Sequence, residues 1–242
     1  MQFRLRMEKK VSVVLATYNE KDNIKVVIEG LIKHVDGLFE VIVVDDNSPD
    51  GTWKIVQEMG KKDKRIRCIH RVHERGLGSA IARGVAESKG NCIGWMDADT
   101  AHPPETMGKM VDALSDYDVA MGSRYVPGGG DDRSSLRIVT SKMLNYYTGA
   151  VLGSFKVHDW HTGFIVGHRR VFDKVTLMDT GYAMYCIKFL RDCVRARFTI
   201  KEIPFINRER TLGESKSIAG TMDLFKHGIN YGIDIIKLRF SK

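Results

Sequence analysis

Short apolar runs alternate with longer amphipathic stretches along the first hundred residues. Residues 11–15, 40–46 and 92–97 each contain a short apolar run, partly β-branched and too short for a helix, and the last two runs end in acidic residues, so they predict buried strands. Residues 65–69 predict a further strand with an alternating pattern. Strands that alternate with helices of about ten to fifteen residues predict an α/β fold, Rossmann-like, with a mostly parallel sheet flanked by helices. Helical patterns occur at residues 24–32, 52–62 and 79–89.

The second half of the chain has a less regular pattern. Residues 118–125 predict a fifth strand that ends in Arg124, and the glycine-rich residues 127–132 predict a loose loop that can act as a gate. Two long helices, at 136–152 and 218–240, carry apolar side chains near helical spacing with basic residues beside them. The other expected elements are a strand opened by residues 159–164, a helix at 181–197, a strand at 199–204 and a basic loop at 208–216.

The two long helices have the composition of amphipathic segments that lie on a membrane. The alternative for the later helix is that it packs on the protein core. We therefore expect one α/β domain over residues 1–216, including the interface helix at about 136–152, and a C-terminal amphipathic membrane-interface helix over 217–242. No uncharged apolar run reaches the length of about 18 residues that a membrane span needs.

Charge and cysteine content narrow the class of protein. Lys and Arg total 38 against 30 Asp and Glu, a formal charge of +8, which favours an acidic partner such as nucleic acid, anionic lipid or a phosphorylated substrate. No nucleic-acid-binding motif accompanies the charge, so no nucleic-acid partner is expected. The four cysteines form no C-x-x-C motif, and no secretory signal is visible, so we expect a cytosolic protein with reduced thiols.

Two carboxylates follow the apolar run at 92–97. Asp97 and Asp99 stand one residue apart, and residues i and i+2 of a strand point to the same side, so the two can converge on one ligand. Such a pair suits Mg²⁺ or Mn²⁺, which keeps open positions for phosphate oxygens. The alternative is a solvated turn that caps the next helix. The position at a strand's carboxyl end favours a ligand site.

Six short motifs occur in order along the chain and together resemble the family-2 glycosyltransferases of the dolichyl-phosphate mannose synthase type. The resemblance implies a GT-A fold, GDP-mannose as donor, Mg²⁺ or Mn²⁺ as cofactor, and inverting transfer of mannose to dolichyl (polyprenyl) phosphate at the cytosolic membrane face. The motifs are Leu-Ala-Thr-Tyr-Asn-Glu at 15–20, Val-Asp-Asp-Asn-Ser-Pro-Asp-Gly-Thr at 44–52, Gly-Leu-Gly-Ser-Ala at 76–80, Met-Asp-Ala-Asp at 96–99 with His-Pro-Pro-Glu at 102–105, Gly-Ser-Arg-Tyr at 122–125 and Gly-Glu-Ser-Lys at 213–216.

The resemblance also implies roles for individual residues. Asp97, Asp99 and Arg124 are the implied catalytic residues. Asp99 is the implied metal ligand, and Ala101 stands at the family's second metal position. Arg124, Arg137 and Ser141 would receive the acceptor phosphate. The implied nucleotide-sugar site comprises Ala16, Tyr18, Glu20, Val44, Asp45, Asp46, Asp97, Ala98, Asp99, Arg124, Arg210 and Lys216.

Three departures from the family pattern leave alternatives open. Ala16 replaces the usual proline, Ala101 replaces a glutamine, and residues 184–187 replace a Phe-Gln-x-Glu pattern. Because Ala101 has no ligating side chain, water or another group must fill that metal position. The third departure leaves open a UDP-glucose or other hexose donor, and Ala101 leaves open a non-catalytic nucleotide-sugar-binding subunit. A membrane-anchor subunit, or a transmembrane segment after this sequence, could complete the membrane contact.

Overall fold

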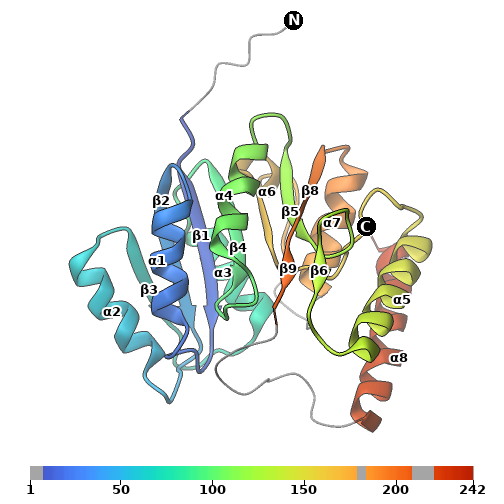
Figure 1. The fold of residues 1–242 in the computed structure, drawn as a ribbon, viewed down its shortest axis with the longest axis horizontal. Helices are drawn as coiled ribbons and strands as arrows, with labels where there is room; N and C mark the ends of the chain where they lie inside the picture. The colour runs from blue at the N-terminus through green and yellow to red at the C-terminus, as the bar shows by residue number, and fades with distance from the viewer. Residues whose placement is uncertain (1–7, 179–183, 209–220, 242) are drawn as a thin grey trace, which may run out of the picture.

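A seven-stranded sheet forms the centre of the molecule in the computed structural model, which describes residues 8–178, 184–208 and 221–241 and, for 221–229, the backbone only (Figure 1). The strand order is β3-β2-β1-β4-β7-β5-β8. Only β7 is antiparallel to its neighbours, β4 and β5. The predicted mostly parallel α/β fold is thus confirmed. The strands are β1 (Val11–Thr17), β2 (Leu38–Asp45), β3 (Ile66–His70), β4 (Cys92–Asp97), β5 (Val119–Ser123), β7 (Ile165–His168) and β8 (Ile200–Pro204).

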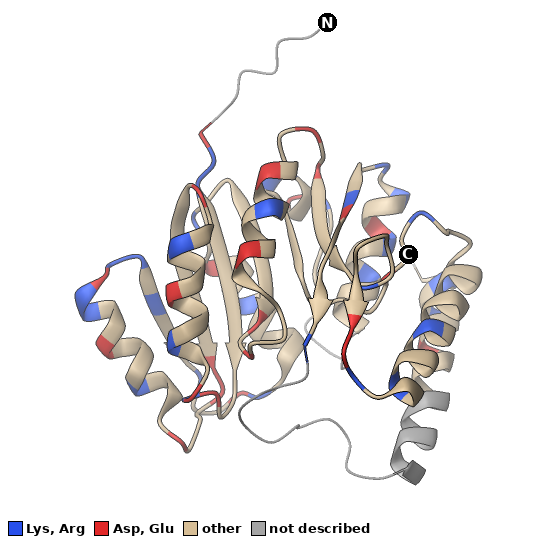
Figure 2. Cartoon of the chain, in the orientation of Figure 1, with Lys and Arg blue, Asp and Glu red and all other residues tan. Residues whose placement is uncertain are grey.

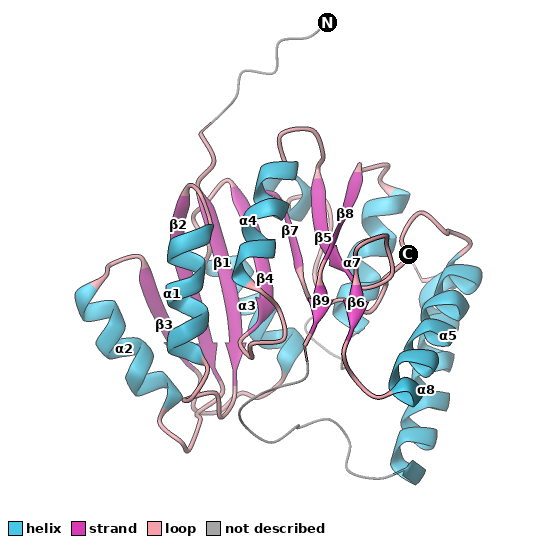
Figure 3. Ribbon diagram, in the orientation of Figure 1, coloured by secondary structure: helices cyan, strands magenta, loops and turns pink. Residues whose placement is uncertain are grey.

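Helices cover both faces of this sheet (Figure 3). Successive residues of β1 face opposite sides of the sheet and lie in two different cores. Val13 lies in the core beneath α1 and α4, and Val14 lies in the core beneath α3 and α7. A strand that is buried on both faces needs apolar residues at every position, which explains the continuous run seen in the sequence. The helices are α1 (Ile24–His34), α2 (Thr52–Lys62), α3 (Leu77–Glu87), α4 (Pro104–Ala113), α5 (Ser135–Leu152), α6 (Arg169–Phe172), α7 (Met184–Arg195) and α8 (Thr221–Phe240).

Gly84 lets α3 lie directly on the sheet. A Cβ atom at this position would come within 2.3 Å of the Val14 side chain, so even alanine would push the helix away from β1.

The region after β5 differs from the prediction in two ways. Residues 159–164 do not open a strand, because the backbone turns there and the strand starts at Ile165. A second, two-stranded sheet of β6 (Gly130–Asp131) and β9 (Ile206–Asn207) was not predicted. Such short strands carry no periodic pattern of their own. The two strands are linked by a hydrogen bond between the side chains of Asn207 and Asp131, which lie 76 residues apart in the chain.

Helices α5 and α8 lie side by side at one end of the molecule (Figure 1). The Tyr147 hydroxyl on α5 donates to the Gly232 carbonyl on α8 at 3.1 Å. Ile235 and Leu238 of α8 are buried in the same core cluster as α7, so the later part of α8 packs on the protein. No helix in the described ranges has the length and apolar character to cross a bilayer.

Candidate active site

The carboxyl ends of β1, β2 and β4 meet at one edge of the sheet. Thr17 pairs in register with Asp45, and Ala16 pairs with Asp97. The motifs at 44–52 and 96–99 therefore lie on either side of the motif at 15–20. Figure 2 shows acidic residues gathered in the loops at this edge. Open α/β sheets bind ligands at this edge, and the structure places the candidate residues there.

Asp45 organises the loop after β2. Its side chain is fully buried and accepts hydrogen bonds from the Thr17 hydroxyl at 2.8 Å and from the N–H and hydroxyl of Ser48 at 2.8 and 2.6 Å. The neighbouring Val44 side chain lies in the core, so only its main chain can face a ligand. These two candidates therefore shape the site through the backbone that they hold in place.

Asp46 ties the β3–α3 loop to the same edge. Its carboxylate forms a buried ion pair with Arg71 and accepts the Gly76 N–H at 2.8 Å. This contact brings the guanidinium of Arg75 over the Tyr18 ring, 5.0 Å from its centroid. Glu20 is buried beside them and accepts a hydrogen bond from the Asn23 amide at 2.9 Å. The residues predicted to surround the nucleoside thus lie on loops that these contacts connect to one another.

The segment from Asp97 to His102 forms a tight turn after β4. The Asp97 N–H donates to Nδ1 of His102 at 3.1 Å, and the His102 ring stacks on Phe164 with centroids 4.7 Å apart. Asp99 is buried and accepts the Ala101 N–H at 3.2 Å, whereas the Asp97 side chain is 43% exposed. Ala101 is also buried and offers no side-chain ligand.

The donor chemistry of this turn fits a divalent cation in part. Two carboxylates supply the hard oxygen ligands that Mg²⁺ and Mn²⁺ prefer. No group of three or more His, Cys, Asp or Glu side chains suited to a metal occurs among the described residues. The residues present therefore fit an ion whose remaining positions are filled by phosphate oxygens and water. Convergence of Asp97 and Asp99 on one ion stays a prediction.

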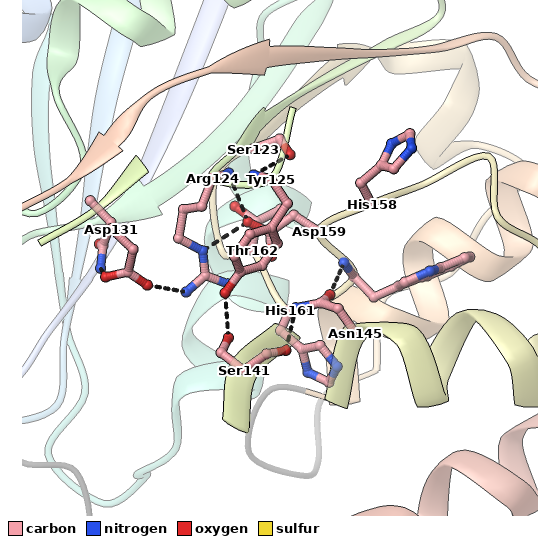
Figure 4. A network of polar contacts seen from close by, with 12 residues as sticks. Ser123, Arg124, Tyr125, Asp131, Ser141, Asn145, His158, Asp159, His161 and Thr162 are labelled. Atoms are coloured by element: carbon pink, nitrogen blue, oxygen red, sulfur yellow. Dashed lines mark hydrogen bonds and ion pairs between the residues drawn. The ribbon is translucent and has the colours of Figure 1, made fainter. Parts of the chain in front are cut away.

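Arg124 is held between two acidic residues (Figure 4). Its Nε and Nη2 donate to the buried carboxylate of Asp159 at 2.8 and 2.7 Å, and its Nη1 lies 3.8 Å from Asp131. Burial disfavours the charged guanidinium, but the hydrogen bonds and charge of Asp159 outweigh it, so the pKa of Arg124 is raised. The pair of Arg124 and Asp159 is therefore a buried ion pair and not an exposed salt bridge.

Asp159 and Asp131 were not predicted from the sequence. Asp159 lies 35 residues from Arg124 in a stretch expected to be a strand, and no spacing rule links the two. Asp131 also binds Arg133, through Nε at 2.8 Å and Nη2 at 2.5 Å. Hydrogen bonds from Arg133 and Asn207 outweigh burial and lower the pKa of Asp131 to about 2.

The predicted acceptor residues occupy separate environments on α5. Arg137 is exposed and forms no ion pair with any other described residue, so it pairs with neither Asp131 nor Asp132. Ser141 is half-buried and accepts a hydrogen bond from the Tyr125 hydroxyl at 2.7 Å (Figure 4). Arg210 and Lys216 lie outside the described residues.

A cavity of about 230 Å³ opens between the acidic turn and Arg124. Two of the predicted catalytic residues, Asp97 and Arg124, line it. Tyr185 and Cys186 also line it, and they belong to the segment that departs from the family pattern. The remaining lining residues, which were not predicted, are Leu77, His102, Arg133, His161, Thr162, Gly163, Phe205 and Asn207.

His161 joins this cavity to the two long helices. Its Nε2 lies 3.0 Å from the Thr148 hydroxyl of α5, and its Nδ1 lies 3.0 Å from the Tyr231 hydroxyl of α8. Because the Thr148 hydroxyl already donates to the Leu144 carbonyl, it accepts from Nε2–H of His161. Burial lowers the pKa of His161 to about 4, so the ring is neutral at pH 7.

The sheet order and the acidic turn after β4 are those of the GT-A fold. The chain belongs to the family described as Glycosyl transferase family 2, whose family model matches residues 12–176. A crystal structure of glucosyl-3-phosphoglycerate synthase from Mycobacterium tuberculosis with Mn²⁺, UDP-glucose and phosphoglyceric acid superposes with a TM-score of 0.71 over 96% of this chain and 79% of that one. At 19% identity, this likeness shows the fold.

Curated relatives lie closer in sequence. The dolichol-phosphate mannosyltransferase of Pyrococcus furiosus is 34% identical over 212 residues, which are 86% of this chain and 59% of that protein. The polyprenol monophosphomannose synthase of Mycolicibacterium smegmatis is 34% identical over 88% of this chain and 82% of the relative. The dolichol-phosphate mannosyltransferase of Saccharomyces cerevisiae is 32% identical over 87% of this chain and 82% of the relative. The chain thus spans only 59% of the length of the Pyrococcus relative.

Proposed function

We propose that the protein transfers mannose from GDP-mannose to a dolichyl or other polyprenyl phosphate, with inversion, at the cytosolic face of a membrane. The observation that carries the proposal is the cavity that Asp97 and Arg124 share at the carboxyl edge of the sheet. Support for this acceptor class comes from relatives named dolichol-phosphate mannosyltransferase and polyprenol monophosphomannose synthase.

The reaction needs no strong general base. The second pKa of a phosphate monoester is about 6, so the acceptor is mostly dianionic at neutral pH. One of its oxygens attacks C1 of the sugar, the bond from C1 to the diphosphate oxygen breaks, and GDP leaves with the electron pair. The protein's task is to bring two anions together and to stabilise the departing diphosphate, which fixed donors and charges do well.

The donor would lie along the connected loops after β1 and β2. Ala16, Tyr18, Glu20, Val44, Asp45 and Asp46 would surround the nucleoside, Asp97 and Ala98 would meet ribose and phosphate, and Arg210 and Lys216 would contact the phosphates. Asp99, with Asp97 nearby, would hold Mg²⁺ or Mn²⁺, which when bound supplies positive charge to the diphosphate. Structures of the Mycobacterium tuberculosis enzyme contain Mn²⁺ in one case and Mg²⁺ in another.

The acceptor would approach from the side of α5 and α8. Arg124, Arg137 and Ser141 are the proposed contacts for its phosphate, with Arg137 near the positive N-terminal end of α5. Both helices expose large apolar side chains, which a lipid surface could cover. An anchor subunit, or a transmembrane segment outside this sequence, would add to this contact. The exposed apolar residues are Leu136, Val139, Met143 and Tyr146 on α5 and Ile233, Ile236 and Phe240 on α8.

A donor panel tests the proposal. The protein is incubated with GDP-mannose, UDP-glucose or UDP-N-acetylglucosamine and a short polyprenyl phosphate, with and without Mn²⁺, and lipid-linked sugar is measured. We expect product from GDP-mannose only, and only with the metal. Product from a UDP-sugar would support a different hexosyltransferase. Nucleotide-sugar binding without product from any donor would support a non-catalytic subunit.

A further inference from the structure

Asn207 of β9 and Arg133, which follows β6, line one wall of the cavity. Asp131 of β6 and Asn207 of β9 are register partners, and both side chains are buried. Nδ2 of Asn207 donates to Asp131 at 3.1 Å, and the same carboxylate holds Arg133. Because β6 and β9 are short, these side-chain contacts fix the wall as much as the backbone does.

The fixed charges on this wall cancel. Asp159 balances Arg124, and Asp131 balances Arg133 through a bidentate pair of the same kind. Each arginine is thus paired with a carboxylate, and its remaining N–H groups can still bind a neutral ligand with many hydroxyl groups.

The wall nevertheless offers hydrogen-bonding groups to the cavity. Both arginines use their Nε and Nη2 edges on carboxylates, and neither Nη1 group donates to a described residue. The ionised carboxylate of Asp131 can only accept, so Nδ2 of Asn207 must face it, and Oδ1 is left as an acceptor. Within the described ranges, no residue donates to that Oδ1 atom. Arg133 and Asn207 both line the cavity, so a donor and an acceptor are available to a ligand there.

Aromatic rings also line the cavity. Phe205 and His102 pack edge to face with centroids 5.4 Å apart, and both line the cavity. Gly163 lines it as well, and a Cβ atom there would be in ordinary contact with the Tyr185 hydroxyl at 3.4 Å and with Oδ1 of Asp97 at 3.5 Å. Flat rings beside fixed polar groups, around about 230 Å³, suit a ligand of the size of one hexose ring.

We infer that this cavity receives the hexose of the donor and that Asn207 and Arg133 are specificity-determining residues that contact its hydroxyl groups. The inference rests on the proposed glycosyl transfer and adds the residues that distinguish one sugar from another. A site that hydrogen-bonds a hydroxyl group discriminates against the sugar that lacks it or presents it differently.

The test compares GDP-mannose with GDP-glucose, which differ only in the configuration at C2. We expect Asn207→Leu and Arg133→Met each to change the ratio of the two kcat/KM values by roughly tenfold, because each removes hydrogen bonds to the sugar. The inhibition constant of GDP should stay within about twofold of the unmodified protein. Arg83→Met is the matched control, since Arg83 is half-exposed on α3, pairs with Glu87 and does not line the cavity.

A constant donor ratio in both variants would overturn the inference, as would an equal loss for both donors together with weaker GDP binding. Arg133→Lys, which keeps the charge and part of the packing, guards against a folding defect in the larger changes. If the unmodified protein uses neither GDP-sugar, the proposed donor has failed. The ratio for UDP-glucose and UDP-galactose then tests Asn207 and Arg133 independently.

Discussion

The charge of Arg124 is compensated inside the protein by Asp159. The Arg124 side chain is 10% exposed and Asp159 is fully buried, so each charge depends on the other. Asp159→Asn keeps the shape but leaves a buried guanidinium with a neutral partner, and we expect a loss of about 3 to 5 kcal/mol in the free energy of unfolding. Urea denaturation measures this change.

Asp63→Asn is the control for that measurement. Asp63 pairs with Arg65 at 2.7 Å near the surface, where both side chains are partly exposed. Its loss should cost at most about 1 kcal/mol. A similar small cost for Asp159→Asn would mean that Asp131 alone can compensate Arg124.

Asp99 gives the second prediction at this scale. Asp99→Asn retains an oxygen that can accept the Ala101 N–H, so the turn should keep its shape while the negative charge is lost. We expect kcat with saturating Mn²⁺ to fall at least about 100-fold. The melting temperature should change little. Asp116→Asn, at an exposed position before β5, is the control: it removes a carboxylate that lies away from the site. Near-normal turnover in Asp99→Asn would remove Asp99 from the metal site.

Helix α5 exposes four large apolar side chains to solvent. Leu136 is 76% exposed and Met143 is 68% exposed. If α5 lies in a membrane interface, Leu136→Glu with Met143→Glu should reduce flotation with anionic liposomes severalfold, because charged groups resist burial among acyl chains. Val26→Glu, at a similarly exposed site on α1, should float like the unmodified protein. Unchanged flotation of the α5 variant would argue against this membrane surface.

His161 makes the packing of α5 and α8 sensitive to acid. Its pKa is about 4 in the folded protein against about 6.5 when unfolded, so the unfolded state binds more protons between these values. Stability should therefore fall as the pH drops from about 6.5 to 4, by roughly 3 kcal/mol at most from this group. Of its charged neighbours, Asp159 favours protonation and Arg124 opposes it.

The variant His161→Gln isolates this effect. Glutamine can still bond to Thr148 or Tyr231 but does not titrate, so its stability should depend less steeply on pH in that interval. His158, which pairs with Glu202, is present in both proteins, so its contribution cancels in the difference. Equal slopes in the two proteins, measured by urea denaturation at several pH values, would contradict the assigned pKa.

At the scale of the whole molecule, the sequence predicted those elements whose bounds depend on the local pattern of apolar and turn residues. The helix at 52–62 was predicted with its observed bounds, because its apolar period and the preceding turn are local signals. The antiparallel place of β7 was not predicted, since strand order depends on contacts between distant segments. Asp131, Asp159 and Asn207 were missed for the same reason: their roles come from partners 35 and 76 residues away.

The metal site is a property of the whole complex of protein, donor and ion. The described residues offer two carboxylates in one turn and no third ligand of the same kind, so metal binding should be weak before the diphosphate arrives. Calorimetric titration with Mn²⁺, alone and with GDP, measures the coupling. We expect GDP to tighten Mn²⁺ binding at least about tenfold, and linkage requires Mn²⁺ to tighten GDP binding by the same factor.

The Asp99→Asn variant separates this coupling from simple attraction between ion and nucleotide. Mn²⁺ and GDP associate in solution, so a gain that persists in the variant would come from their own complex. In the unmodified protein, the gain should exceed that background because Asp99 would contact the ion while the loops after β1 and β2 hold the nucleoside. Tight Mn²⁺ binding without nucleotide would instead require ligands beyond this turn, and the site would then have to be reassigned.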